Sequence, residues 1–204
     1  MYGFADTVCF ELRRNARRMA LCALAVFLCA PLLLKLFDAG ARPAERAVET
    51  ASALAGIAAM CAVFRPERAR GVRESVAVRG VPVAALWGVR AAWLLTAVWV
   101  FSCGCALLLR AMGCDVGRRA ALAGFANAAF TGGEAALCAA LAQSAVVGAA
   151  LPALAFALDL CGLAPARLTL FCDWQGLAGN KLLLCLCGLA MLAAALRVRT
   201  LRDG

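Results

Sequence analysis

Hydrophobic residues along this chain fall into about six blocks of roughly 17–21 residues, separated by short polar stretches. The blocks cover residues 19–37, 47–64, 91–109, 120–141, 145–163 and 178–196. At about 1.5 Å of rise per residue, a helix of this length crosses a hydrocarbon layer of about 30 Å, in some cases only with tilt or flanking adjustment. The pattern therefore predicts an all-α, polytopic membrane protein with about six transmembrane helices.

The overall composition agrees with this pattern. Apolar residues make up 65% of the 204 positions and the mean hydropathy is +0.86, which is far above the usage of soluble domains. The longest stretch between two blocks runs from residue 65 to residue 90, which is too short for a soluble domain. We therefore expect residues 1–204 to form a single transmembrane domain.

The distribution of basic residues predicts the orientation. The chain has 21 Lys and Arg against 12 Asp and Glu, and 13 of the 21 lie in segments on one side of a six-span protein. The opposite side holds the other basic residues, including Arg110, Arg118 and Arg119. Because basic loops stay inside, we expect a multi-pass protein of the bacterial cytoplasmic (inner) membrane with both termini in the cytoplasm.

The residues before the first block predict an interfacial helix. Phe4, Val8 and Leu12 recur every four residues, and four arginines crowd the end of this segment, as in helices that lie along a membrane surface. A cleaved signal peptide is the alternative, since Ala39-Gly40-Ala41 has the small residues of a cleavage site. The first block is longer than the usual apolar region of a signal peptide, which favours an uncleaved span.

Twelve cysteines raise the question of redox or metal chemistry. Most of them lie inside the apolar blocks, there is no Cys-x-x-Cys pair, and the chain has no histidine. Haem ligation by imidazole and mixed Cys/His zinc sites are therefore excluded, and we expect the thiols to pack as small apolar side chains. An intramembrane thiol or quinone oxidoreductase is retained as an alternative, and it would need two thiols poised at one membrane face.

Charged residues inside the apolar blocks are candidate functional residues, because ionisable groups are costly in a bilayer. Glu134 and Asp159 are the two carboxylates placed well within a block, at different depths of the membrane. Lys181 enters the sixth block from the side on which Asp159 lies, so we expect an Asp159–Lys181 ion pair. Glu134 follows Thr131-Gly132-Gly133, where we expect the glycines to loosen the helix and admit water.

The polar stretch between the second and third blocks predicts a short amphipathic helix. Pro66 suits a first helical position, Glu67 suits the positive N-terminal end, and Gly80 with Pro82 ends the segment. Val72 and Val76 share one face, and we expect that face to pack on the transmembrane bundle. A solvated basic linker is the alternative.

These residues carry a family resemblance. The chain resembles the six-span permease subunits of type-2 ATP-binding-cassette (ABC) transporters, which open with a basic interfacial helix. Their loop between spans two and three carries a pattern similar to Pro66-Glu67-Arg68, Gly71, Glu74 and Pro82. The segment before their last span often holds short re-entrant helices, which residues 163–179 resemble; an ordinary outer loop is the alternative.

The resemblance implies a partner and a function. In this family the loop is a coupling helix that docks on a cytoplasmic ATPase, which assigns that role to Glu67, Arg70, Gly71 and Glu74. The chain has no phosphate-binding loop of its own, so ATP and Mg²⁺ are expected on a separate ABC ATPase subunit, with no cofactor, metal or catalytic residue on this chain. A second permease copy or a related permease would complete the transporter. The implied function is export of an amphipathic substrate: a peptide, lipid, drug or haem-like molecule. The substrate-capturing membrane component of a vitamin importer is a further alternative.

Overall fold

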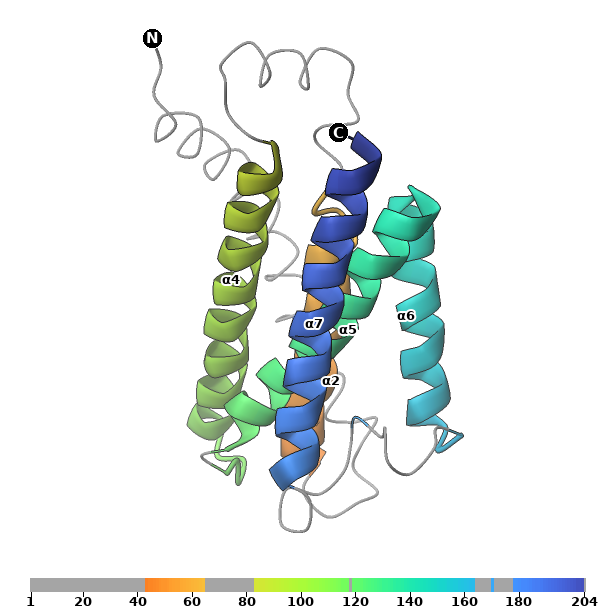
Figure 1. The fold of residues 1–204 in the computed structure, drawn as a ribbon. Coiled ribbons are helices and arrows are strands. Elements are labelled where there is room, and N and C mark those ends of the chain that lie inside the picture. Colours follow the sequence, from red (N-terminus) through yellow and green to blue (C-terminus); the bar gives the residue numbers. More distant parts are fainter. Residues whose placement is uncertain (1–42, 65–82, 118, 164–169, 171–177, 204) are drawn as a thin grey trace, which may run out of the picture.

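The computed structural model describes residues 43–64, 83–117, 119–163, 170 and 178–203, and in these ranges it is all-helical (Figure 1). The five helices are α2 (Pro43–Met60), α4 (Val83–Ala111), α5 (Ala120–Ala142), α6 (Ala145–Leu160) and α7 (Ala178–Asp203). The predicted interfacial helix, the first expected span and the predicted coupling helix lie outside the described residues. The all-α prediction is confirmed for the part of the chain that is described.

Three of the described helices are long and apolar enough to cross a membrane: Val83–Ala111, Ala120–Ala142 and Asn180–Arg202. α6 is apolar but has only 16 residues, and α2 carries Glu45, Arg46 and Glu49 near its start. The chain is therefore a helical membrane protein. The sequence predicts about six spans, and the described helices provide three of them.

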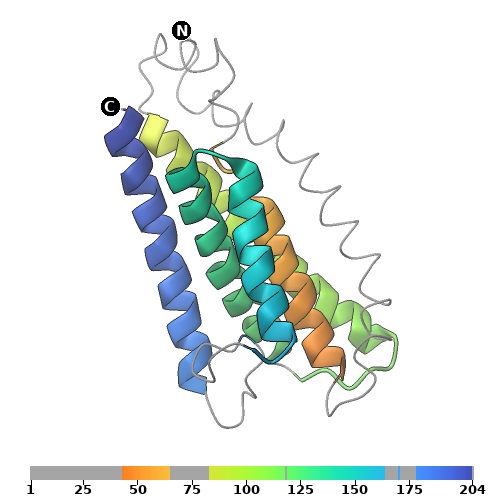
Figure 2. The ribbon, with the colours of Figure 1, turned by 90° about the vertical axis from the view of Figure 1, so that its right-hand side faces the viewer.

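α5 lies at the centre of the bundle and packs against each of the other four helices (Figures 1 and 2). α2, α5 and α7 begin at one end of the bundle, where α4 and α6 finish; we call it the Lys181 end. The opposite end, where α7 finishes, is called the Arg202 end. Each helix except α2 also turns large apolar side chains outward: among them are Val100, Leu107, Leu122, Leu154, Leu182 and Leu186. A bilayer covers such side chains as well as a protein core does.

Glycines allow α5 to approach its neighbours closely. A Cβ atom at Gly56 of α2 would overlap the Ala128 carbonyl of α5, and a Cβ at Gly133 of α5 would overlap the Gly188 carbonyl of α7. A Cβ at Gly132 would be 3.0 Å from Met60 Cγ and 3.2 Å from the Gly56 carbonyl oxygen, which leaves little room. The expectation that Gly132 and Gly133 loosen the helix and admit water is wrong, because both glycines are buried at tight helix contacts.

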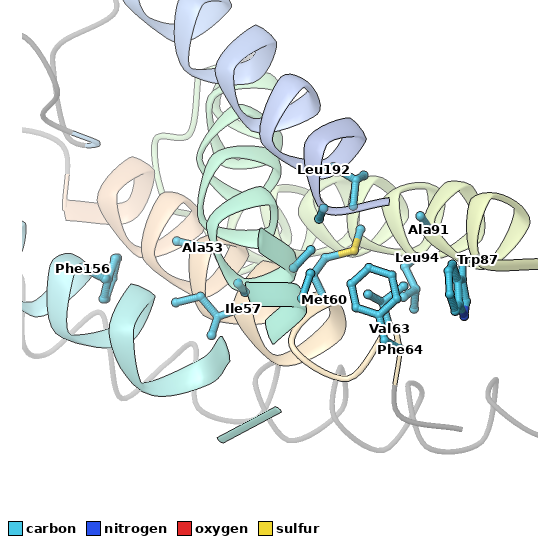
Figure 3. Packing of buried hydrophobic residues seen from close by; sticks show 14 of the residues in the cluster. Ala53, Ile57, Met60, Val63, Phe64, Trp87, Ala91, Leu94, Phe156 and Leu192 are labelled. Atoms are coloured by element: carbon cyan, nitrogen blue, oxygen red, sulfur yellow. The ribbon is translucent and has the colours of Figure 1, made fainter. Parts of the chain in front are cut away.

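Larger apolar side chains fill the space between α2, α4 and α7 near the Arg202 end (Figure 3). The rings of Phe64 and Trp87 meet edge to face, with centroids 5.5 Å apart. Arg90 Nη1 donates to the carbonyl oxygen of Val63 at 2.6 Å, which fixes the turn after α2 against the start of α4.

The last turn of α7 is tied to the end of α5. Arg202 Nη1 donates to the carbonyl oxygen of Leu141 at 2.9 Å and to that of Ala140 at 3.3 Å. These are carbonyls at a helix C-terminus, where no further turn supplies N–H donors and where a cation is favoured. A single arginine side chain therefore holds the ends of α5 and α7 together.

Candidate functional site

The Lys181 end of the bundle holds a buried cluster of polar side chains from four helices. Its centre is Lys181 of α7, which is only 1% exposed. Lys181 Nζ lies 3.1 Å from Glu49 Oε2 of α2 and donates to Asn127 Oδ1 of α5 at 2.9 Å. It also donates to the carbonyl oxygen of Leu170. The ammonium thus has three acceptors, matching its three N–H donors.

Asn127 connects the members of this cluster to one another. Its Nδ2 atom donates to the Leu170 carbonyl oxygen at 2.9 Å and to Glu49 Oε2 at 3.3 Å. One turn further along α5, Thr131 Oγ1 donates to the Ala53 carbonyl oxygen of α2 at 3.0 Å. Buried polar groups in an apolar bundle must find such partners, and here α5 supplies them to both α2 and α7.

Asp159, near the end of α6, is the second carboxylate of the cluster. Its Oδ2 atom accepts the Leu170 backbone N–H at 2.7 Å. Its Oδ1 atom is buried and has no hydrogen-bond partner among the described residues. Asp159 and Lys181 therefore hold the N–H and the C=O of the same residue.

The predicted direct ion pair between Asp159 and Lys181 is wrong, because the carboxylate that pairs with Lys181 belongs to Glu49. Asp159 is nevertheless in the same cluster, on the opposite side of Leu170. The reason is geometric: α2 and α7 both begin at the Lys181 end, so Glu49 and Lys181 reach each other at a similar depth.

Sequence reasoning missed Glu49 and Asn127. Glu49 stands near the start of the second apolar block, where a carboxylate is easily taken for an end-of-helix residue facing water. A comparison of depths would have found it, because alternating spans place the starts of blocks two and six on the same side. Asn127 is neutral, and one amide in an alanine-rich block gives no signal before the fold is known.

Glu134, the remaining intramembrane candidate, does not join this cluster. It is half-buried on α5, two turns beyond Asn127. No hydrogen bond or ion pair to it is seen in the described part of the chain. The structure therefore separates Glu134 from Asp159 and Lys181, in line with the different depths expected from the sequence.

The predicted ATPase-binding residues Glu67, Arg70, Gly71 and Glu74 lie outside the described residues. The helices that flank them are described: α2 leads into that segment and α4 follows it, both at the Arg202 end. The Arg90–Val63 hydrogen bond holds the two flanking ends together.

Thiols and metal ligands add no second site in the ranges that the structure covers. The eight described cysteines are all free, and within the same ranges no three His, Cys, Asp or Glu side chains gather as metal ligands would. Cys105 is buried and Cys161 is exposed, so these thiols do not share one environment. Among the described residues, the polar cluster around Lys181 is thus the strongest candidate for a functional site.

This cluster places hydrogen-bond donors on one side and a hydrogen-bond acceptor on the other, within an apolar bundle. Lys181 and Asn127 present donors, Asp159 presents an acceptor, and Glu49 balances the charge of Lys181.

Comparison of the chain with models of protein families, with curated protein sequences and with solved structures finds no match.

Proposed function

We propose that this chain is the membrane-spanning permease subunit of a type-2 ABC transporter, an exporter of an amphipathic substrate driven by a separate ATPase. In this proposal the protein crosses the bacterial inner membrane about six times, with both termini in the cytoplasm. Two permease chains, alike or related, pair with cytoplasmic ATPase subunits that carry ATP and Mg²⁺.

The observation that carries the proposal is the spacing of Pro66-Glu67-Arg68, Gly71, Glu74 and Pro82 between two apolar helices. In the family that this pattern resembles, the segment is the coupling helix that transmits ATP hydrolysis to the membrane domain. An amphipathic helix with two carboxylates suits a docking surface, because charged groups across an interface give partner specificity.

The described helices are compatible with such a segment. α2 and α4 flank it at the Arg202 end, and that end also carries Arg197, Arg199 and Arg202. These three belong to the 13 of 21 Lys and Arg that a six-span topology places on one side, and an excess of basic residues marks the cytoplasmic side of a multi-pass protein. This supports a segment that faces the cytoplasm, where an ATPase would meet it.

The proposal is tested by reversing the charges of the loop. The full chain carrying Glu67→Lys and Glu74→Lys is co-expressed with an ABC ATPase that co-purifies with the wild-type chain, and both are purified through a tag on the permease. Like charges juxtaposed at an interface cost several kcal/mol, so we expect the ATPase to be lost from the complex and its turnover to fall to the unstimulated rate.

The matched control is Arg68→Ala in the same loop, which removes a charge without reversing one and is expected to retain the ATPase. Each variant is extracted from washed membranes, which shows that it inserts, and its monodispersity is measured by size-exclusion chromatography in detergent. If the double reversal still co-purifies with an active ATPase, the loop is a linker and the exporter assignment loses its main support.

A further inference from the structure

Leu170 is bound by the bundle in the way a protein binds a separate peptide residue. Its N–H donates to Asp159 Oδ2, and its C=O accepts from both Asn127 Nδ2 and Lys181 Nζ. The three side chains come from three different helices of the bundle, α5, α6 and α7, and all are at least nine-tenths buried. Both main-chain polar groups of Leu170 are therefore hydrogen-bonded by side chains rather than by neighbouring backbone.

The side chain of Leu170 is recognised as well. It is 4% exposed and belongs to the main hydrophobic cluster, together with Ile57 of α2 and Phe156 of α6. A binding site for a small ligand in a protein combines an apolar lining with a few polar groups that fix orientation. The surroundings of Leu170 have both parts.

We propose that this site binds a leucine-like aminoacyl unit, and that in the present structure the chain's own Leu170 occupies it. The ligand displaces Leu170 and repeats its contacts: the nitrogen on Asp159, the carbonyl or carboxylate on Lys181 and Asn127, and the apolar side chain in the hydrophobic cluster. The inference rests on the proposed function and specifies its substrate class, an apolar amino acid or a peptide that contains one.

The charges at the site fit either source of this unit. In a peptide, an amide N–H replaces that of Leu170. In a free amino acid, an ammonium group meets the Asp159 carboxylate, whose buried Oδ1 atom has no partner among the described residues and is available for a second N–H. At the other pole, Glu49 neutralises Lys181, so both a neutral carbonyl and a carboxylate are accommodated.

Occupation by Leu170 should weaken binding from solution. The apparent affinity of a ligand is reduced by the fraction of molecules in which its site is vacant. Leu170→Ala removes most of the apolar burial that holds the internal residue in place, and it also leaves space for the ligand's side chain. The variant should therefore bind an external leucine unit at least about tenfold more tightly than the wild type.

The experiment uses the full chain in lipid nanodiscs, without ATPase or nucleotide. Equilibrium binding of two radiolabelled probes is measured: free leucine, and leucine N-acetylated and C-methylamidated so that it carries no charge. We expect Leu170→Ala to bind one or both probes at least about tenfold more tightly than the wild type. Ser102→Ala, which removes a buried hydroxyl between α4 and α2 away from the cluster, serves as the matched control and should bind as the wild type does.

A second substitution distinguishes the two sources. Asp159→Asn keeps an oxygen that accepts an amide N–H but removes the charge that an ammonium needs. Added to Leu170→Ala, it should abolish binding of free leucine while sparing the blocked probe. Undiminished binding of free leucine by the double variant would show that Asp159 does not bind the ligand nitrogen, and would overturn the assigned pose.

If Leu170→Ala binds neither probe more tightly than the wild type, the site is an anchor for the chain alone and the proposal fails. Should that variant aggregate, Leu170→Val gives the same test with a smaller expected increase, and no increase there has the same meaning. Because the assay contains no ATPase, its outcome is independent of the co-purification test. Tighter binding to Leu170→Ala, together with an ATPase that fails to co-purify with the wild-type chain, would leave this site standing and remove the exporter assignment.

Discussion

Lys181 and Glu49 form an ion pair that the bundle shields from water. An isolated charge inside a membrane protein is strongly unfavourable, and an ion pair offsets that cost only when its hydrogen bonds are complete. Here Asn127 donates to Glu49 and accepts from Lys181, so each charged group has a hydrogen bond to a neutral amide in addition to the ion pair. The pair therefore specifies how α2, α5 and α7 meet more than it adds net stability.

This gives a prediction for single and double substitutions. Lys181→Met should destabilise the detergent-solubilised protein by about 3–5 kcal/mol, because it leaves the Glu49 carboxylate buried without its partner. Adding Glu49→Gln should restore a large part of that loss, since no uncompensated charge then remains. Thermal unfolding of the wild type, both single variants and the double variant gives the coupling energy of the pair.

A parallel double-mutant cycle with Asp159 should behave differently. Asp159→Asn retains an oxygen that accepts the Leu170 N–H, so its cost should be about 1 kcal/mol. Combined with Lys181→Met, it should recover much less than Glu49→Gln does, because no direct contact joins Asp159 to Lys181. A larger coupling energy for Asp159 than for Glu49 would contradict the hydrogen-bond arrangement described above.

These residues show how far the sequence predicts a site. The sequence points to Asp159 and Lys181 because charges in apolar blocks are rare and costly. It predicts the wrong partner for Lys181, because the position of a residue along its own span gives its depth but not which helices are neighbours. The contact between α2 and α7 at this end follows from how both pack on α5, and no local pattern encodes it.

At the scale of the helices, α5 joins the bundle through close backbone contacts. Gly56, Gly133 and Gly188 have no side chains to keep the axes apart, so α2 and α7 approach α5 until backbone atoms touch. Van der Waals contact of this kind drives helix association in lipid, where burying apolar surface gives no gain over exposing it to acyl chains.

The helix contacts predict opposite outcomes for two glycine substitutions. Gly188→Ala should destabilise the protein by about 1–3 kcal/mol, because the added methyl group would overlap the Ala129 carbonyl of α5. Gly104→Ala on α4 is the matched control: no atom lies within 4 Å of the added Cβ, so stability should be unchanged or rise by up to about 1 kcal/mol. Thermal unfolding in one detergent compares the two variants, and equal effects would contradict the tight α5–α7 contact.

The sequence predicts the helices themselves better than their ends. Each described helix overlaps one apolar block, but α4 begins at Val83 and α7 continues to Asp203, beyond their blocks. A count of apolar residues detects only the part of a helix that lies in hydrocarbon. Polar turns such as the one that contains Arg202 remain helical because their side chains find partners outside the hydrocarbon, here the carbonyl groups at the end of α5.

At the scale of the whole molecule, the orientation in the membrane is the main prediction. Reporter fusions after Gly80 and Gly204 should give a cytoplasmic signal, and fusions after Gly40 and Gly113 a periplasmic one, because 13 of the 21 Lys and Arg lie in segments that a six-span topology places on one side. Alkaline phosphatase and fluorescent-protein fusions measure the two locations independently. A periplasmic signal at Gly80 would invert the topology and remove the coupling segment from reach of any ATPase.

The ion pair between Glu49 and Lys181 also has a consequence for how the protein is made. Glu49 is synthesised roughly 130 residues before its partner, so at about 5–20 residues per second it waits on the order of 10 s for a counter-ion. During that interval α2 carries a charge that lipid does not solvate well. We therefore expect α2 to stay beside the insertion machinery, or at the water interface, until α7 emerges. In this order of synthesis, α7, the last described helix, completes the membrane insertion of α2, the first described helix.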